Sequence, residues 1–117
     1  MTDPVAIDRD ALERLRDWGG EKLVGQMLRL FLENSLVRME QIRSGIEEEE
    51  LEKAEMGAHS LKSSAANVGA AELRRIAAEV ELEAIDDNLE AVQGLLPQIE
   101  DAYRAARVEL ESIEKGS

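Results

Sequence analysis

The chain has 117 residues, enough for one hydrophobic core, and a net charge of −12 from 26 acidic and 14 basic residues. Such an acidic balance argues against nucleic acids and anionic membranes as partners, and the absence of cysteine excludes disulfides and thiolate chemistry. Aromatic residues make up only 3% of the chain, so we expect an all-α protein. No segment is long and apolar enough to span a membrane and no signal peptide opens the chain, so we expect a cytoplasmic protein.

The first expected helix is short. Asp10 is the predicted N-cap, with Glu13 as its reciprocal partner, and the glycines at 19–20 should end the helix. Its apolar residues are Leu12, Leu15 and Trp18. We expect a long second helix over residues 21–44, which Gly45 should terminate. One side of that helix carries Leu23, Val24, Met27, Leu30, Phe31, Asn34 and Arg38.

The third expected helix begins in the acidic run 47–50, because carboxylates suit a helix N-terminus, and Gly69 should break it after Val68. Its inward stripe is Leu51, Ala54, Ala58, Leu61 and Ala65. The fourth helix should start near Ala70, before a turn at 86–88. Its expected inward-facing residues are Leu73, Ile76, Ala77, Val80 and Ala84.

The last expected helix covers residues 89–114, and Pro97 should bend it or leave a carbonyl unpaired. Together the elements predict an antiparallel up-down four-helix bundle with a short N-terminal cap helix. We expect residues 1–117 to form a single domain with an ordered core of about 8–114. The segments Met1–Ile7 and Lys115–Ser117 should be loose.

His59 is the one histidine of the chain, and on a helical wheel it lies outside the apolar stripe of its helix. Lys62, Ser63 and Ala66 follow it at helical spacing. The small side chains would leave the imidazole open to a large partner, and the lysine would put a cation nearby. An open imidazole beside an ammonium suits a nucleophile that accepts a phosphoryl group.

The antiparallel fourth helix should bring a glutamate to the height of His59. Glu81 lies on the flank of that helix beside the inward Val80, and Glu79 is the competing candidate. A carboxylate that accepts the Nδ1 proton would fix the tautomer and leave the Nε2 lone pair free. Either glutamate could instead be an ordinary solvated residue.

The stretch "AHSLKSSAANVGAAEL" resembles the signature of histidine-containing phosphotransfer (Hpt) domains. That signature reads His-x-Leu-Lys-Gly-Ser-small, followed by an apolar residue and Gly-Ala. The matching positions are His59, Leu61, Lys62, Ser64, Ala65, Val68, Gly69 and Ala70. Family members commonly carry Gln or Glu 22 positions after the histidine, where this chain has Glu81. Ser63 departs from the pattern, because the family most often has glycine there.

The resemblance implies a phosphorelay shuttle. His59 would take a phosphoryl group from the aspartyl phosphate of one receiver domain and pass it to the aspartate of another. Lys62 would neutralise the phosphoryl oxygens, and Glu81 would orient the imidazole. Ser63, Ala66 and Gly69 are the small residues expected to give access and packing around His59.

The same resemblance implies that the chain binds no metal or cofactor of its own, because Mg²⁺ and most of the catalytic groups would come from the receiver. No Gly-rich nucleotide loop is present, so we expect no autokinase activity. The expected partners are response-regulator receiver domains and a hybrid or chemotaxis-type histidine kinase, and we expect a monomer.

Docking would use apolar residues near His59 that lie off the core stripes. Met56 is the nearest candidate. On the second helix, Leu28, Leu32 and Leu36 could contribute.

Three alternatives are open. Glu55 and His59 share a helix face as metal ligands could, but one histidine without cysteine makes a zinc site improbable. The chain could be a non-catalytic helical adaptor in which His59 has no role. It could also be the phosphorylatable domain of a chemotaxis-type kinase, since Glu at the position of Glu81 is found there too.

Overall fold

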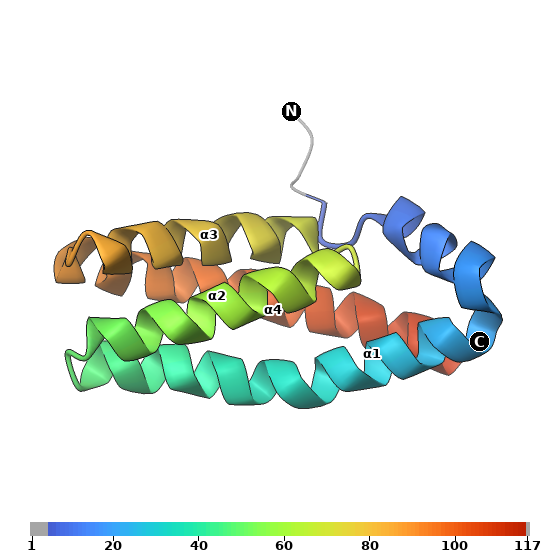
Figure 1. Cartoon of the computed structure of the whole chain (residues 1–117), viewed down its shortest axis with the longest axis horizontal. Coiled ribbons are helices and arrows are strands. Elements are labelled where there is room, and N and C mark those ends of the chain that lie inside the picture. The colour runs from blue at the N-terminus through green and yellow to red at the C-terminus, as the bar shows by residue number, and fades with distance from the viewer. Residues whose placement is uncertain (1–4, 117) are drawn as a thin grey trace.

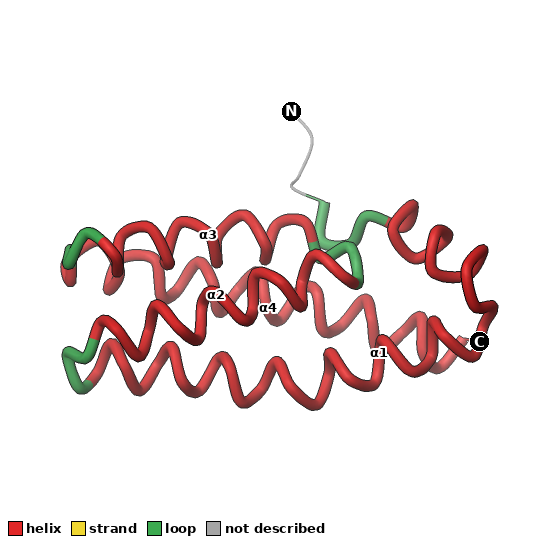
Figure 2. Tube along the Cα trace, in the orientation of Figure 1, coloured by secondary structure: helices red, strands yellow, loops and turns green. Residues whose placement is uncertain are grey.

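The computed structural model describes residues 5–116, and within that range every regular element is a helix (Figure 2). The four helices lie side by side along the long axis of the molecule (Figure 1). Each packs on its neighbour in sequence, and α1 also packs on α4, which closes the bundle. The predicted antiparallel up-down four-helix bundle is confirmed. Its helices are α1 (Arg9–Glu47), α2 (Leu51–Asn67), α3 (Ala71–Ile85) and α4 (Leu89–Gly116).

The predicted cap helix is the first part of α1. Gly20 has a non-helical backbone (φ 71°, ψ −169°), so the chain changes direction there and the preceding segment lies across one end of the bundle (Figure 1). The predicted N-cap at Asp10 is wrong by two residues. Asp8 is the N-cap, and its carboxylate accepts a hydrogen bond of 3.0 Å from the Asp10 backbone N–H. Glu13 pairs with Arg16 instead of closing a capping box.

Gly45 does not end α1, so that prediction is wrong. The helix continues to Glu47, and Gly45 is buried inside it. A Cβ at Gly45 would lie 2.7 Å from the Ala54 backbone nitrogen and 3.0 Å from the Glu50 carbonyl oxygen. The glycine is therefore needed for close packing against the turn, and not as a terminator.

The acidic run 47–50 forms the end of α1 and the turn after it, where Glu49 has a φ of 57°. The expectation that α2 begins inside this run is therefore wrong, because α2 begins at Leu51.

The predicted inward stripe of α1 is rotated from the observed one. Leu30 is 52% exposed, whereas Leu28 is fully buried. The physical reason is that α1 packs on both α2 and α4, so its buried arc is centred between those two helices. The buried residues of its long part are Val24, Leu28, Phe31, Leu32, Ser35, Met39, Ile42, Gly45 and Ile46.

The α2 and α3 stripes agree with the sequence prediction, and all ten predicted residues are buried. The break at Gly69 is also confirmed, because α2 ends at Asn67 and Gly69 has a φ of 74°. The Asp8 backbone N–H donates to the Gly69 carbonyl oxygen at 2.6 Å, which attaches the start of α1 to this turn.

The expected loose ends differ from the structure. Ile7 is 3% exposed and belongs to the core, so the segment before α1 is anchored at that residue. Lys115 and Gly116 continue α4. Val5 is 60% exposed, and residues 1–4 and Ser117 lie outside the described residues.

A buried polar cluster joins α1 to α4. The Ser35 hydroxyl donates to the Tyr103 oxygen at 3.0 Å, and Arg107 donates to the same oxygen at 2.9 Å. Arg107 also donates to the Leu32 carbonyl at 3.2 Å. These bonds satisfy Ser35, which has no exposed surface, and add directional contacts to an otherwise apolar interface.

Helix α4 runs through Pro97 without a break in its helical assignment. The carbonyl four residues earlier belongs to Gln93, an exposed residue. No helix within residues 5–116 has the length and apolar character needed to cross a membrane.

Gly69→Ala should destabilise the fold by about 1–3 kcal/mol, because alanine resists the positive φ and its Cβ would overlap the Asp8 carbonyl. Thermal unfolding followed by circular dichroism should show a midpoint at least about 4 °C lower. Gly94→Ala is the matched control, since a Cβ at this helical position meets nothing within 4 Å. Equal midpoints for both variants would contradict the structural role of Gly69.

Candidate phosphoryl-acceptor site

His59 lies on the outer face of α2, and its side chain is 62% exposed. Its neighbours Ala58 and Leu61 are fully buried, so the helix turns one face to the core and presents the imidazole on the other. A core-filling role for His59 is therefore excluded.

Glu81 of α3 holds both His59 and Lys62. Its Oε2 lies 2.5 Å from His59 Nδ1, and its Oε1 lies 2.5 Å from Lys62 Nζ. His59 and Lys62 are three residues apart on one face of α2, so a single carboxylate on the adjacent helix reaches both. The Glu81 side chain is only 13% exposed and the Lys62 side chain 32% exposed.

This contact fixes the state of the imidazole. Burial raises the pKa of Glu81, but hydrogen bonds from Lys62 and His59 outweigh that effect and hold the pKa below its ordinary value. Glu81 is therefore ionised at neutral pH and can only accept hydrogen bonds. Nδ1 must carry the proton of the neutral ring, which leaves the lone pair on Nε2.

Glu79, the competing candidate, has a different partner. Its Oε1 accepts a hydrogen bond of 2.8 Å from Arg75, one turn earlier on the same helix. Glu81 is thus the glutamate that contacts His59, as expected from its place on the flank of α3.

The small residues expected near His59 divide into two groups. Ser63 and Ala66 are exposed at the fourth and seventh positions after His59, on the same face of α2. Gly69 does not belong to this surface, so its expected place around His59 is wrong. It lies in the turn after α2, where it packs against Asp8 and Ala11.

The exposed apolar residues of α1, α2 and α3 include two that the sequence analysis missed. Met56 lies one turn before His59 and is 58% exposed, and Leu36 is 52% exposed. Both are therefore accessible, as a docking residue would need to be. Leu28 and Leu32 are core residues, so their expected place on a docking surface is wrong. The missed residues are Leu82 and Ile85.

Leu82 and Ile85 are more than half exposed on α3, at the first and fourth positions after Glu81. Both fall outside the inward stripe of that helix, which is the signal that could have identified them.

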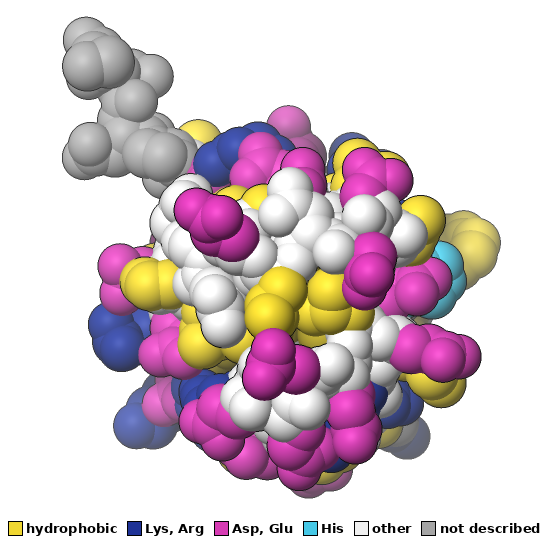
Figure 3. All heavy atoms as spheres, turned by 90° about the vertical axis from the view of Figure 1, so that its left-hand side faces the viewer, with side chains coloured by type: hydrophobic (Ala, Val, Ile, Leu, Met, Phe, Trp, Pro, Cys, Tyr) yellow, Lys and Arg dark blue, Asp and Glu magenta, His cyan; other side chains and the backbone are white. Residues whose placement is uncertain are grey.

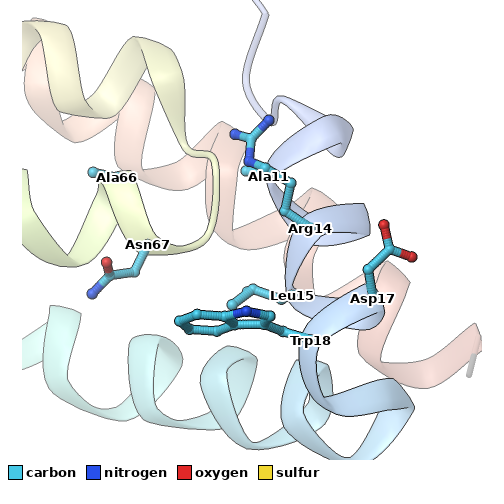
Figure 4. Close-up of a pocket in the computed structure, with 7 residues that line it drawn as sticks. All are labelled: Ala11, Arg14, Leu15, Asp17, Trp18, Ala66 and Asn67. Carbon is cyan, nitrogen blue, oxygen red and sulfur yellow. The ribbon is translucent and has the colours of Figure 1, made fainter.

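A pocket of about 470 Å³ lies further along this side of the bundle, between the first part of α1 and the end of α2 (Figure 4). The residues that line it are Ala11, Arg14, Leu15, Asp17, Trp18, Ala66 and Asn67. Ala66 therefore borders both this pocket and the face of α2 that carries His59.

Charge is unevenly distributed along the bundle. Acidic side chains crowd the end formed by the α1–α2 and α3–α4 turns, with the histidine at the edge of that view (Figure 3). Residues 47–55 include six glutamates, whereas residues 60–71 contain no carboxylate. Within residues 5–116, no three histidine, aspartate or glutamate side chains converge as metal ligands would.

The family model of the Hpt domain matches residues 26–109 of the chain. In structure, the chain is similar to histidine-containing phosphotransfer protein B (HptB) from Pseudomonas aeruginosa PAO1, with a TM-score of 0.91, 21% identity, and coverage of 98% of this chain and 99% of that one. It is also similar to a rice protein assigned as a histidine-containing phosphotransfer protein, with a TM-score of 0.79, 18% identity, and coverage of 94% and 80%. At these identities the structural matches show the fold alone. Among curated proteins, no sequence matches significantly.

Removing the carboxylate of Glu81 should release the tautomer of His59. In Glu81→Met the Nδ1–H form loses its acceptor, so ¹⁵N NMR of the neutral ring should show a mixture of tautomers in place of one dominant form. Glu81→Gln is the matched control, because its amide oxygen can still accept the Nδ1 proton. A tautomer ratio unchanged in Glu81→Met would contradict an orienting role for Glu81.

Proposed function

The chain belongs to the Hpt domain family, and we propose that His59 is the residue on which it carries the phosphoryl group. Hpt proteins act in phosphorelays with receiver domains and kinases, so this chain is a phosphotransfer intermediate of two-component signalling. The observation that carries the assignment to His59 is the exposed imidazole whose Nδ1 contacts the Glu81 carboxylate, with Lys62 on the second oxygen of the same group.

In the proposed step, the Nε2 lone pair of His59 attacks the phosphorus atom of an aspartyl phosphate on a receiver domain. A nitrogen–phosphorus bond forms, the bond between phosphorus and the aspartate oxygen breaks, and the aspartate leaves as a carboxylate. The ring keeps its Nδ1 proton and becomes positively charged. Ionised Glu81, 2.5 Å from Nδ1, stabilises that charge. The reverse step on a second receiver aspartate returns His59 to its starting state.

Lys62 supplies the positive charge for the phosphoryl oxygens. Its ammonium has three N–H donors and uses one of them on Glu81, so two can face the incoming group. The hydrogen bond to Glu81 keeps the ammonium on the His59 side of α2, which reduces the rotamer freedom lost at the moment of transfer.

The chain supplies a nucleophile, an orienting carboxylate and a counter-charge. We expect Mg²⁺ to be held by the partner receiver domain, near the aspartyl phosphate that donates the group. Ser63, four residues after His59, is small enough to leave access from that side, and its exposed hydroxyl can donate a hydrogen bond to a phosphoryl oxygen.

The exposed apolar residues around His59 suit a partner that docks and leaves. Met56 lies one turn before His59 on α2, and Ile85 lies one turn after Glu81 on α3. We propose that they contact the receiver domain. Leu28 and Leu32 take no part, because both are buried in the core.

His59→Gln should abolish phosphorylation. Incubation with a receiver domain phosphorylated by acetyl phosphate should place acid-labile, base-stable label on the wild-type chain and none on the variant. A non-catalytic adaptor would take no label in either form, so wild-type labelling separates the two functions. Label that persists undiminished in His59→Gln would contradict the assignment of His59.

Lys62→Ala should slow transfer about 10–100-fold, because a charge-assisted hydrogen bond of about 1.5–3 kcal/mol to the phosphoryl group is lost. Rapid-quench measurement of label transfer gives the rate, and Lys62→Arg is the charge-preserving control. The circular dichroism spectrum should be unchanged, since the Lys62 side chain is partly exposed. An unfolded Lys62→Ala variant would indicate that the residue is structural instead.

A further inference from the structure

The charges around His59 do not balance once the residue carries a phosphoryl group. Before transfer, the negative charge of Glu81 is matched by the positive charge of Lys62, 2.5 Å away. Transfer adds about two negative charges with the phosphoryl group, and the ring gains one positive charge because it keeps its Nδ1 proton. The sum is then about one negative charge. After the receiver has left, one further cation of the chain itself would bring the site to neutrality.

Arg38 of α1 is a cation without a carboxylate partner. Its Nη1 donates a hydrogen bond of 3.2 Å to the neutral side-chain oxygen of Gln41, and within residues 5–116 it makes no ion pair. A guanidinium has five N–H donors, so the others are open to an anion. The other described lysines and arginines that lack an ion pair are exposed, whereas Arg38 is partly buried.

Arg38 lies on the edge of α1 that faces α2, close to the level of His59. A Cβ at Gly57 would lie 3.2 Å from the Arg38 carbonyl oxygen and 3.3 Å from the Gln41 Cβ. Gly57 precedes His59 by two residues, which is about 3 Å along the helix axis. Because Gly57 has no side chain, α1 and α2 approach closely here, and the long side chain of Arg38 can extend over the surface of α2.

Ser60 is the α2 residue between Arg38 and His59. It follows His59 in sequence and shares a side of the helix with Gly57 and Ser64. Both of these face α1, since Gly57 packs against it and Ser64 lines a pocket together with α1 residues. The small side chain of Ser60 leaves the way from α1 to the imidazole open.

The reactive nitrogen of His59 is directed away from α3. Glu81 holds Nδ1 from the α3 side, and in an imidazole ring the bonds on Nδ1 and Nε2 point in nearly opposite directions. A phosphoryl group on Nε2 is therefore placed toward solvent and the α1 side of α2. Lys62 approaches it from the α3 side, which leaves the α1 side for a second cation.

The neighbouring charges on α2 do not supply that second cation. Glu55 and Glu52 lie one and two turns before His59, and neither makes an ion pair with a described residue. Lys53 is already bonded to Glu48 at 3.1 Å. A phosphoryl group on His59 thus meets like charge toward the start of α2, and the cation open to it on α1 is that of Arg38.

We propose that Arg38 binds the phosphoryl group on His59 from the α1 side, opposite to Lys62. The guanidinium exchanges its hydrogen bond to Gln41 for hydrogen bonds to two phosphoryl oxygens, a bidentate contact that suits its planar geometry. No proton is transferred in this exchange. The inference rests on the proposed function and adds to it a phosphoryl-binding residue from a second helix.

Arg38→Ala tests this contact with phosphoramidate, a small donor that needs no docking surface. The rate of His59 labelling should fall about 3–10-fold, because a partly exposed, charge-assisted contact to the phosphoryl group is lost. Arg38→Lys should recover part of the rate. Arg29→Ala is the matched control, since Arg29 is an exposed arginine nine residues earlier, on the opposite side of α1.

NMR of the wild-type chain tests the contact without a substitution that could disturb the fold. Phosphorylation should shift the ¹H–¹⁵N signal of the Arg38 side chain, and the side-chain amide signals of Gln41 should shift as its partner leaves. The Arg38 signal is identified by its loss in Arg38→Lys. Circular dichroism of each variant should show the helix content of the wild type.

The possible outcomes separate the two proposals. An unchanged labelling rate in Arg38→Ala, equal losses in Arg38→Ala and Arg29→Ala, or an Arg38 signal that does not move on phosphorylation would overturn the role of Arg38. The proposed function would then still stand, because His59 would take label. If neither phosphoramidate nor a phosphorylated receiver domain labelled the wild-type chain, both proposals would fail.

Discussion

The site depends on one carboxylate shared between two helices. Glu81 of α3 accepts a hydrogen bond from His59 and another from Lys62, both on α2. Burying this carboxylate as an unpaired anion would be costly, and the hydrogen bonds from its two donors offset that cost. The contact also requires α2 and α3 to pack closely and in register, which the alanines of their facing stripes and the turn at Gly69 provide. Nucleophile, counter-charge and helix packing are thus parts of one arrangement.

The elements nearest this contact were the most predictable. In α2 and α3 the inward apolar residues recur with helical period, so the wheel identifies the buried side even though Leu82 and Ile85 of α3 lie outside it. Counting residues through a tight turn then brings Glu81 to the height of His59. Helix α1 was less predictable, because Leu30, Leu36 and Val37 add apolar residues outside its buried arc. Only the tertiary position of α4, bonded to α1 through Tyr103 and Arg107, determines that Leu28 and Leu32 face inward.

The structural roles of the glycines were the hardest to predict from the sequence. Gly20 and Gly69 have positive φ and do what a break signal predicts. Gly45 and Gly57 are buried inside helices, where each leaves room for another part of the chain. A Cβ at Gly57 would lie 3.0 Å from an Ile42 side-chain carbon and 3.2 Å from the Arg38 carbonyl. A terminating glycine and a close-packing glycine look alike in sequence, because the difference lies in the approach of a second helix.

The first part of α1 is held at both of its ends. Asp8 is bonded to the turn at Gly69, Ile7 is buried beside it, and Gly20 joins the segment to the rest of the helix. Arg9 adds an ion pair of 3.1 Å with Glu109 of α4. A segment fixed in this way cannot swing freely, so the backbone that carries Trp18 is held in a nearly constant position. Covering this segment would therefore cost little backbone entropy, because the backbone is preorganised before any partner arrives.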